Sequence, residues 1–328
     1  MQCDNVEKYR IVAISNPRSG RNKRGGFEKF KNSLTGFPAI VHIVTTNQTD
    51  LIEALDKCKQ FACNILIVNG GDGTLLQILT YLKKPENKAF DPQLVLLQAG
   101  TTSMAYGDVG CKGKINAVLA KIIGYSGGDI QQLNHTKRSV LQMTIPAKSQ
   151  VVCGMFFGGG AIYNGILYCR QKIHTKGVRG EVGPSVAMLR YILDWLTVNK
   201  MTTSTRACVQ ADDMDVIEGD FTIITATTLK RLLMGVYPFW GNATSKSNVL
   251  VTLIKRNAPK ATKAFLKILS GNKPGVEIED DYYRSLSPSK VTLDIYDGFT
   301  LDGELFGEPG CLTQVVIESA GEVTFLTA

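Results

Sequence analysis

Hydrophobic positions in the first part of the chain alternate between short apolar runs and stretches with helical spacing. Four runs have the length of buried strands, at residues 11–14, 40–44, 65–68 and 94–97. Apolar residues three or four positions apart follow the first and last of these runs, at Phe27, Phe30 and Leu34 and at Ile115, Val118, Leu119, Ile122 and Ile123. Strands that alternate with helices predict a parallel α/β sheet. We expect Asp50 to cap the helix that precedes the third strand.

The pattern changes after the segment 126–129, Ser-Gly-Gly-Asp, and strands dominate from there on. The strand-like runs lie at residues 140–145, 151–157, 221–225, 249–254, 291–296 and 315–318. We therefore predict two domains, an N-terminal α/β Rossmann-like domain over residues 1–130 and a C-terminal β-sandwich domain over residues 131–328.

The strongest chemical signal is the segment 69–75, Asn-Gly-Gly-Asp-Gly-Thr-Leu, between the third strand and a helix. A strand–turn–helix junction directs backbone N–H groups and the positive end of the helix to one point, which favours phosphate. Glycines allow the backbone to approach phosphate oxygens without a side-chain clash. Asp72 is an acid in a site that favours phosphate, and a carboxylate would normally repel that anion. The conflict is resolved if the site also contains a divalent cation or a proton that Asp72 abstracts. A plain tight turn remains the alternative for this segment taken alone.

Two further turns with glycine follow strands of the same sheet. They are residues 16–20, Asn-Pro-Arg-Ser-Gly, and residues 99–103, Ala-Gly-Thr-Thr-Ser. The carboxyl ends of parallel strands are where open α/β sheets bind their ligands. Neither the P-loop pattern nor the Gly-x-Gly-x-x-Gly pattern is present, because Leu76 stands at the last glycine position.

Together these segments resemble the diacylglycerol kinase catalytic family, which includes sphingosine kinases and bacterial lipid kinases and is distantly similar to NAD kinases. The resemblance rests on Asn-Pro-x-Ser-Gly, Gly-Gly-Asp-Gly-Thr and a Gly-Thr-x-x-x-Ala segment, followed late by Asp302-Gly303-Glu304. It implies an ATP-dependent phosphotransferase that acts on a lipid hydroxyl, of the diacylglycerol or sphingoid type, with ATP and Mg²⁺ bound in a cleft that the second domain completes.

The resemblance also implies roles for individual residues. Asp72 and Glu304 would be the catalytic acids and the magnesium ligands, from different domains. The nucleotide would be bound by the residues Asn16, Ser19, Gly71, Gly73, Thr74 and Thr101, with Lys176 and Arg179 on the phosphates. Phosphoryl transfer needs charge neutralisation, in-line positioning and a proton acceptor, which this set supplies.

Two alternatives stay open. NAD kinases share the Gly-Gly-Asp-Gly-Thr turn, although the sequence lacks their Asn-Pro-Gly-x-Leu-Gly-Phe turn with its Asn-Glu/Asp pair. A catalytically silent lipid-binding regulatory protein is suggested by Ser103 and Met104, which stand where many relatives carry Asn-Asp.

Composition and charge bear on partners and location. The net charge of +8 includes eight basic residues and one acid, Glu28, between Lys8 and Lys31, and a second basic stretch runs from Arg170 to Arg179. We expect peripheral contact with an anionic membrane surface and no nucleic-acid partner, and a homodimer is left open. No secretory signal or membrane-spanning run is present, and the eight cysteines form no Cys-x-x-Cys pair. These features favour a cytoplasmic protein.

Overall fold

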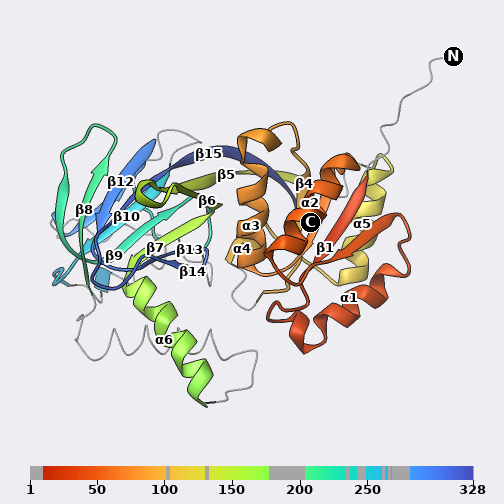
Figure 1. The fold of residues 1–328 in the computed structure, drawn as a ribbon, viewed down its shortest axis with the longest axis horizontal. Coiled ribbons are helices and arrows are strands. Elements are labelled where there is room, and N and C mark those ends of the chain that lie inside the picture. The colour runs from red at the N-terminus through yellow and green to blue at the C-terminus, as the bar shows by residue number, and fades with distance from the viewer. Residues whose placement is uncertain are drawn as a thin grey trace. The chain divides into compact units, whose positions relative to one another are not determined.

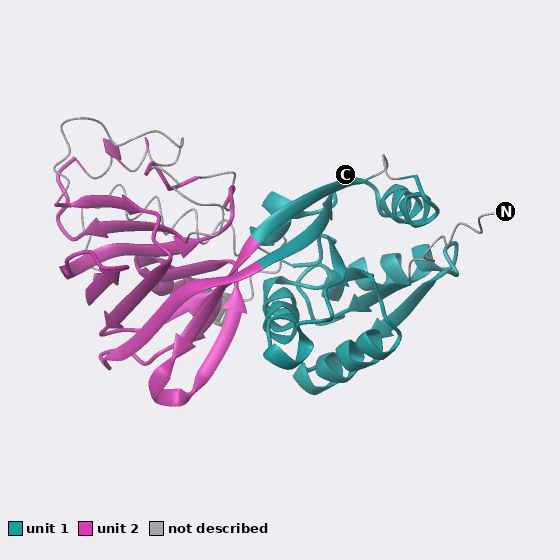
Figure 2. Cartoon of the chain, turned by 90° about the horizontal axis from the view of Figure 1, so that it is seen from above, with its two compact units in different colours: residues 1–138, 322–328 teal, residues 139–321 magenta. Residues whose placement is uncertain are grey.

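The computed structural model describes residues 10–100, 104–129, 133–176, 204–232, 237–241, 249–260, 263–264, 267 and 281–327, without the side chains of Cys169 and residues 171–176. The chain divides into two compact units, coloured separately in Figure 2. Unit 1 comprises Met1–Arg138 and Glu322–Ala328, and unit 2 comprises Ser139–Gly321. The C-terminal segment, which the sequence analysis assigned to the second domain, belongs to unit 1 because Phe325 pairs with Leu94 in parallel.

Unit 1 contains a parallel sheet in the order β2-β1-β3-β4. Figure 1 labels β1 and β4 of this sheet. Its strands are β1 (Ile11–Ser15), β2 (Ile40–Val44), β3 (Ile65–Asn69) and β4 (Gln93–Leu96). All five residues of β1 and of β3 are buried, as expected for inner strands of a parallel sheet covered on both faces. These four strands confirm the apolar runs predicted from the sequence.

The helices of unit 1 alternate with these strands. They are α1 (Gly26–Leu34), α2 (Gln48–Gln60), α3 (Asp72–Leu82), α4 (Met104–Val109) and α5 (Ile115–Ser126), with short 3-10 turns η1 (Asn22–Arg24) and η2 (Pro85–Asn87). The β1–β2 connection runs across the sheet in one direction and the β2–β3 connection in the other. Right-handed crossovers therefore place α1 and α2 on opposite faces.

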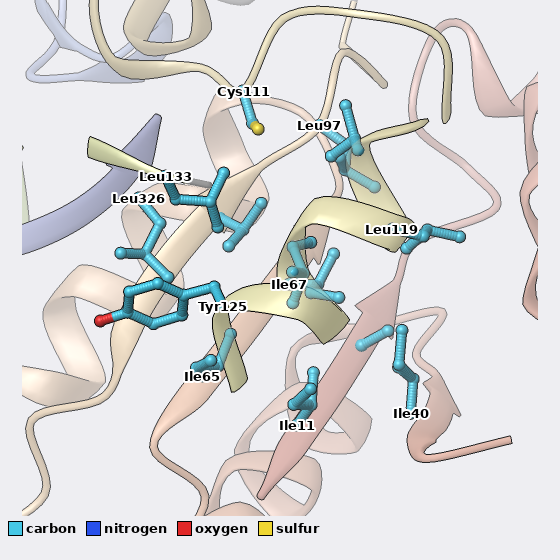
Figure 3. Packing of buried hydrophobic residues seen from close by; sticks show 14 of the residues in the cluster. Ile11, Ile40, Ile65, Ile67, Leu97, Cys111, Leu119, Tyr125, Leu133 and Leu326 are labelled. Atoms are coloured by element: carbon cyan, nitrogen blue, oxygen red, sulfur yellow. The ribbon is translucent and has the colours of Figure 1, made fainter. Parts of the chain in front are cut away.

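The core on the α1 face is one apolar cluster, shown in Figure 3. Alternate strand residues such as Ile11, Ile65 and Ile67 pack there against Phe30 of α1 and Leu119 of α5, and all are less than 4% exposed. Because side chains of a strand alternate between its two faces, their neighbours in sequence are buried on the other face. The sheet is thus held from both sides, and the strand ends that carry the turns have a rigid base.

Unit 2 is strand-rich and largely antiparallel, which confirms the predicted fold class of an α/β region followed by a strand-rich one. Its strands are β5 (Asn134–Ile145), β6 (Gln150–Gly154), β7 (Phe156–Gly160), β8 (Thr205–Ala211), β9 (Ile217–Thr227), β10 (Leu250–Lys255), β11 (Tyr283–Leu286), β12 (Lys290–Ile295), β13 (Phe299–Leu301), β14 (Glu304–Phe306) and β15 (Thr313–Thr327). β5 begins in unit 1 and β15 ends there. A short turn η4 (Pro146–Lys148) joins β5 to β6, and the helix α6 (Ala161–Lys176) packs against β7, β9 and β13.

Two local predictions are corrected by the structure. Asn47, not Asp50, is the N-cap of α2, since its side chain accepts from Asp50 N at 2.9 Å. Asp50 instead accepts from the N–H of Thr46, the residue before the N-cap, at 2.9 Å, which fixes the chain where it enters the helix. The predicted strand 151–157 is interrupted at Met155, where the Asp302 carboxylate accepts from the backbone N–H groups of Met155 and Phe156.

No helix among the described residues is both long enough and apolar enough to cross a bilayer.

Candidate active site

Two of the predicted turns, residues 16–20 and 69–74, are joined by hydrogen bonds in unit 1. The Asn16 N–H donates to Asn69 O at 3.0 Å, and the Asn16 carboxamide donates to the Thr74 hydroxyl at 3.2 Å. The Ser19 hydroxyl accepts from the Gly71 N–H at 3.0 Å. The sheet explains this proximity, because Ser15 and Asn69 are paired at the carboxyl ends of β1 and β3.

The three glycines of the second turn have different surroundings, and a steric need for glycine is shown at Gly70. A Cβ on Gly70 would lie 2.6 Å from the Thr74 Cβ, so only glycine leaves room for that threonine side chain. Gly71 lies close to the third turn, since a Cβ there would be 3.5 Å from the Cα of Gly100, but this is an ordinary contact distance that does not itself require glycine. Gly73 is the second residue of α3, where a backbone N–H has no partner within the helix.

Asp72 is the first residue of α3 and is half-buried. Its Oδ2 accepts a hydrogen bond from the Met104 N–H at 3.3 Å, so the carboxylate links the starts of α3 and α4. A carboxylate at a helix N-terminus is stabilised by the positive end of the helix dipole. It is also the kind of oxygen ligand that Mg²⁺ prefers, usually with one or two carboxylates and substrate phosphates. The donor chemistry of Asp72 therefore fits a magnesium ligand.

A small, open hollow lies beside this carboxylate. It is lined by the turn residues Gly70, Gly71 and Asp72, by apolar side chains of the strand ends and of α3, and by Ala105 and Tyr106 of α4. The Tyr106 hydroxyl donates to Cys111 O at 3.3 Å. Burial raises the pKa of Tyr106, so this side chain is neutral at physiological pH and lines the hollow without charge.

The third turn is only partly described. Arg21 N donates to Ala99 O at 2.9 Å, and the Arg21 guanidinium donates to the Gln98 side chain at 2.6 Å, which ties the first turn to the third. Thr101, predicted to contact the nucleotide, lies outside the described residues, as do Thr102 and Ser103.

Glu304 lies in unit 2, on β14, in a hairpin with β13. The two residues between these strands, Asp302 and Gly303, both have positive φ, at 48° and 84°, and Leu301 pairs with Glu304 across the turn. In the sequence, Asp302-Gly303-Glu304 is a motif of three consecutive residues. The structure makes its first two residues the hairpin turn, the conformation for which Asp-Gly is preferred.

Asp302 and Glu304 have different surroundings in this hairpin. The Asp302 carboxylate accepts from the backbone N–H groups of Met155 and Phe156 at 3.0 and 2.9 Å, so it fastens the turn to the β6–β7 junction. Glu304 is exposed and lies 3.4 Å from the guanidinium of Arg170 on α6, which also donates to Gly303 O at 2.8 Å. Glu304 is thus the more exposed of the two acids, and Asp302 is half-buried against the backbone.

The remaining predicted residues lie on or after α6. Lys176 is the last residue of α6 and its side chain is outside the description, and Arg179 lies outside the described residues. The structure thus brings together Asn16, Ser19, Gly71, Asp72 and Thr74 within unit 1. Asp72 and Glu304 belong to different units, so their shared cleft stays a prediction.

Sequence reasoning missed two contributors to these surroundings. Arg170 was counted only as part of a basic stretch, and its pairing with Glu304 depends on a hairpin that had not been predicted. Asn22 was not noticed at all, although its buried side chain donates to two backbone carbonyls of the turns. An isolated asparagine carries no pattern that would reveal such a role. Among the described residues, no three His, Cys, Asp or Glu side chains gather as a ready metal site.

Comparison with known proteins agrees with the resemblance seen in the sequence. Residues 10–133 match the family model of the diacylglycerol kinase catalytic domain. The matched segment contains both joined turns and Asp72.

Solved structures show the same fold over nearly the whole chain. A diacylglycerol kinase from Bacillus anthracis str. Sterne is 17% identical, with 96% of each chain covered and a TM-score of 0.61. Another Bacillus anthracis str. Sterne structure, provisionally assigned as a diacylglycerol kinase, is 16% identical with a TM-score of 0.65, covering 99% of this chain and 97% of that one. No curated protein sequence matches the chain.

The resemblance to the diacylglycerol kinase catalytic family is therefore confirmed, through a catalytic-domain match in the N-terminal part of the chain and a fold shared with kinases of that name. A domain of this kind indicates a phosphotransferase.

Proposed function

We propose that the chain is an ATP-dependent lipid kinase that transfers the γ-phosphate of ATP to the hydroxyl group of a lipid alcohol, of the diacylglycerol or sphingoid type. The observation that carries this proposal is the joined pair of turns in unit 1. Asn16, Ser19, Gly71 and Thr74 converge there on the start of α3, whose first residue is Asp72. Backbone N–H groups and a helix N-terminus favour phosphate, and the carboxylate favours the metal that accompanies it.

The chemistry assigned to the residues follows from what phosphoryl transfer requires. Little covalent work falls to the protein, so positioning and electrostatic stabilisation dominate. Asn16, Ser19, Gly71, Gly73, Thr74 and Thr101 position the phosphates, with Lys176 and Arg179 neutralising their charge. Asp72 and Glu304 together supply the metal ligand and the acceptor for the hydroxyl proton. Mg²⁺, when bound, polarises the transferring phosphoryl group and neutralises developing charge.

The lipid substrate requires access to a bilayer, and charge in unit 1 supports a peripheral mode of contact. Arg18, Arg21, Lys23, Arg24, Lys29 and Lys31 are all exposed within and after the first turn. Glu28 is the one acid in this stretch. Each basic residue near an anionic surface contributes about 1 kcal/mol, weakened by salt.

ATP turnover in the presence and absence of lipid tests the proposal. Purified protein is incubated with ATP and Mg²⁺ alone, with vesicles containing diacylglycerol, with a sphingoid base, or with NAD. Turnover that requires one of the lipid alcohols supports the proposal. Turnover with NAD alone would make the chain an NAD kinase, and lipid binding without turnover would make it a silent lipid-binding protein.

A further inference from the structure

The side chain of Asn22 is buried between the two phosphate-facing turns of unit 1. Asn22 is the first residue of η1, the short turn that joins the first phosphate turn to α1, and it is 5% exposed. Its carboxamide nitrogen donates to Asn16 O at 2.8 Å and to Asn69 O at 3.0 Å. The two N–H bonds of a carboxamide thus each reach a backbone carbonyl, one in each turn.

Both carbonyls have a second donor as well. Asn16 O also accepts from the Ser19 N–H at 3.2 Å, and Asn69 O also accepts from the Asn16 N–H at 3.0 Å. A carbonyl oxygen has two lone pairs, so Asn22 completes the hydrogen bonding of both. If its nitrogen were removed, the partly buried carbonyl of Asn16 and the buried carbonyl of Asn69 would each lose a hydrogen-bond partner, and the loss costs most at Asn69.

The two residues that carry these carbonyls belong to the turns that contact the ligand in the proposed reaction. The carbonyl of Asn16 accepts a hydrogen bond from Asn22, and the side chain of Asn16 donates one to the Thr74 hydroxyl. Asn69, the other acceptor, immediately precedes Gly70 and Gly71, and Gly71 is bonded to Ser19. A change at Asn22 therefore acts on the spacing between the turns, while the sheet beneath keeps its register through the pairing of β1 and β3.

We propose that Asn22 is a positioning residue for the nucleotide phosphates. Its carboxamide clamps the first turn to the second, so that the groups on both turns are spaced for one ligand before it binds. The inference rests on the proposed function, since it takes ATP as that ligand. Asn22 is not a catalytic residue, because its donors are occupied by backbone carbonyls. Preorganisation of this kind acts on affinity, because the bound conformation need not be formed at the moment of binding.

A purely structural role would also follow from burial, and Asn87 provides a matched control. Asn87 is 3% exposed, lies in unit 1, ends a 3-10 turn, and donates its carboxamide N–H to the carbonyl of Tyr81 at 2.8 Å. It stands beyond the C-terminal end of α3, while the phosphate turns stand at the other end. The 11 residues of α3 separate the two sites by about 15 Å at 1.5 Å per residue.

The experiment compares Asn22→Ala with Asn87→Ala in the full chain. Thermal unfolding measures the structural cost of each change, calorimetric titration with ATP measures affinity, and hydrogen exchange of the segments 16–24 and 69–75 measures the order of the turns. We expect comparable losses of unfolding temperature. We expect ATP affinity to fall on the order of 10-fold in Asn22→Ala only, with faster exchange in the two turns. The KM for ATP should rise while the KM for the lipid stays unchanged.

Milder and isosteric variants keep the test decisive if Asn22→Ala does not fold. Asn22→Ser retains one hydroxyl donor and should lie between the wild type and Asn22→Ala, with Asn87→Ser as its control. Asn22→Leu keeps a similar branched shape without charge but lacks both N–H donors, so it should behave like Asn22→Ala if the hydrogen bonds matter, and like the wild type if only packing matters.

Wild-type affinity for ATP in Asn22→Ala, or equal losses of affinity in the Asn22 and Asn87 variants, would overturn the inference and leave the proposed function intact. A wild-type protein that binds no ATP would overturn the proposed function, and the inference with it. The exchange data, which need no ligand, then show whether Asn22 orders the turns at all.

Discussion

The hydroxyl of Ser19 accepts a hydrogen bond from the backbone N–H of Gly71 at 3.0 Å, across 52 positions of sequence. The residue that caps the start of α3 is thus bonded to the first turn. Since the Ser19 oxygen is an acceptor in this contact, the hydroxyl proton is directed elsewhere, and a phosphate oxygen is the partner we expect for it.

Replacing Ser19 by Ala should therefore weaken ATP binding. The variant loses both the bond to Gly71 and the donor to phosphate, and we expect the KM for ATP to rise on the order of 10-fold, the size expected for a lost charge-assisted hydrogen bond. Steady-state kinetics with ATP varied at saturating lipid measures this. An unchanged KM would show that Ser19 only supports the turn.

Asp72→Asn should abolish transfer without unfolding the protein. Asparagine retains an oxygen acceptor for the Met104 N–H but lacks the charge needed for a metal ligand or a base. A loss of turnover on the order of 10²-fold or more is expected. Turnover assays alongside thermal unfolding check this, and near-normal turnover by a stable variant would remove Asp72 from the catalytic set.

Glu304→Gln should reduce turnover strongly while ATP binding and stability stay close to those of the wild type. Its ion pair with Arg170 is half-exposed, with 50% and 48% of the two side chains accessible, so losing it costs little stability. The matched control is Glu218→Gln, which breaks an exposed pair with Arg206 in the same unit at 3.0 Å. The control should retain full turnover.

The double variant Asp72→Asn with Glu304→Gln tests whether the two acids act together. Residues that act as a unit show losses that are far from additive, so the double variant should be little worse than the poorer single one. Fully additive losses would mean that Glu304 works independently of Asp72.

Membrane contact should depend on the basic residues of the first turn region. Replacing Lys23, Arg24 and Lys29 by Gln should weaken binding to anionic vesicles, and binding of the wild type should weaken as salt rises. Replacing the exposed Lys57, Lys112 and Lys137 by Gln changes the net charge equally and serves as the control. Sedimentation with vesicles measures both. Equal effects of the two triple variants, or strong binding to neutral vesicles at high salt, would contradict an electrostatic membrane contact made by the basic residues around the first turn.

The pH dependence of stability should reflect His42. Its Nε2 lies 2.9 Å from the Ser15 hydroxyl and its ring packs against Phe30, and burial together with the nearby charge of Lys31 lowers its pKa from 6.5. The unfolded chain therefore takes up this proton first as pH falls. The stability from neutral His42 is present above pH 6.5 and is lost as pH falls through the lowered folded pKa.

Urea unfolding at a series of pH values from about 8 to about 5 measures this effect. His42→Gln keeps a hydrogen-bonding side chain at this position but does not titrate there, so its stability should fall less steeply on the acid side. Parallel curves for the two proteins would assign the pH dependence to other groups.

The sheet of unit 1 was predictable because burial of strands on both faces leaves a strong apolar signal, as in residues 11–14 and 65–68. The turn at Gly70 was predictable for a related reason. The Thr74 side chain leaves room only for glycine at position 70, and both residues lie within the same short motif, so this requirement can be read from the sequence.

The positions that sequence reasoning missed depend on distant partners. Asn22 is significant only because Asn16, which follows β1, lies beside Asn69, the last residue of the neighbouring strand β3. In the sequence, Asp302 is visible only as the first residue of the Asp-Gly-Glu motif. In the structure it sits in a hairpin turn with positive φ, where its carboxylate is satisfied by backbone N–H groups 146 and 147 positions away. Neither partner set follows from spacing along the chain.

The most direct test of the central claim is the fate of the γ-phosphate. ATP labelled with heavy oxygen in that group is incubated with Mg²⁺, a panel of lipid alcohols, and either the wild type or Asp72→Asn, and the lipid phase is analysed by mass spectrometry. The account predicts a labelled phosphate ester on a lipid hydroxyl with the wild type and on the order of 10²-fold less with the variant. Label found only in inorganic phosphate, or a labelled lipid made equally well by Asp72→Asn, would contradict it.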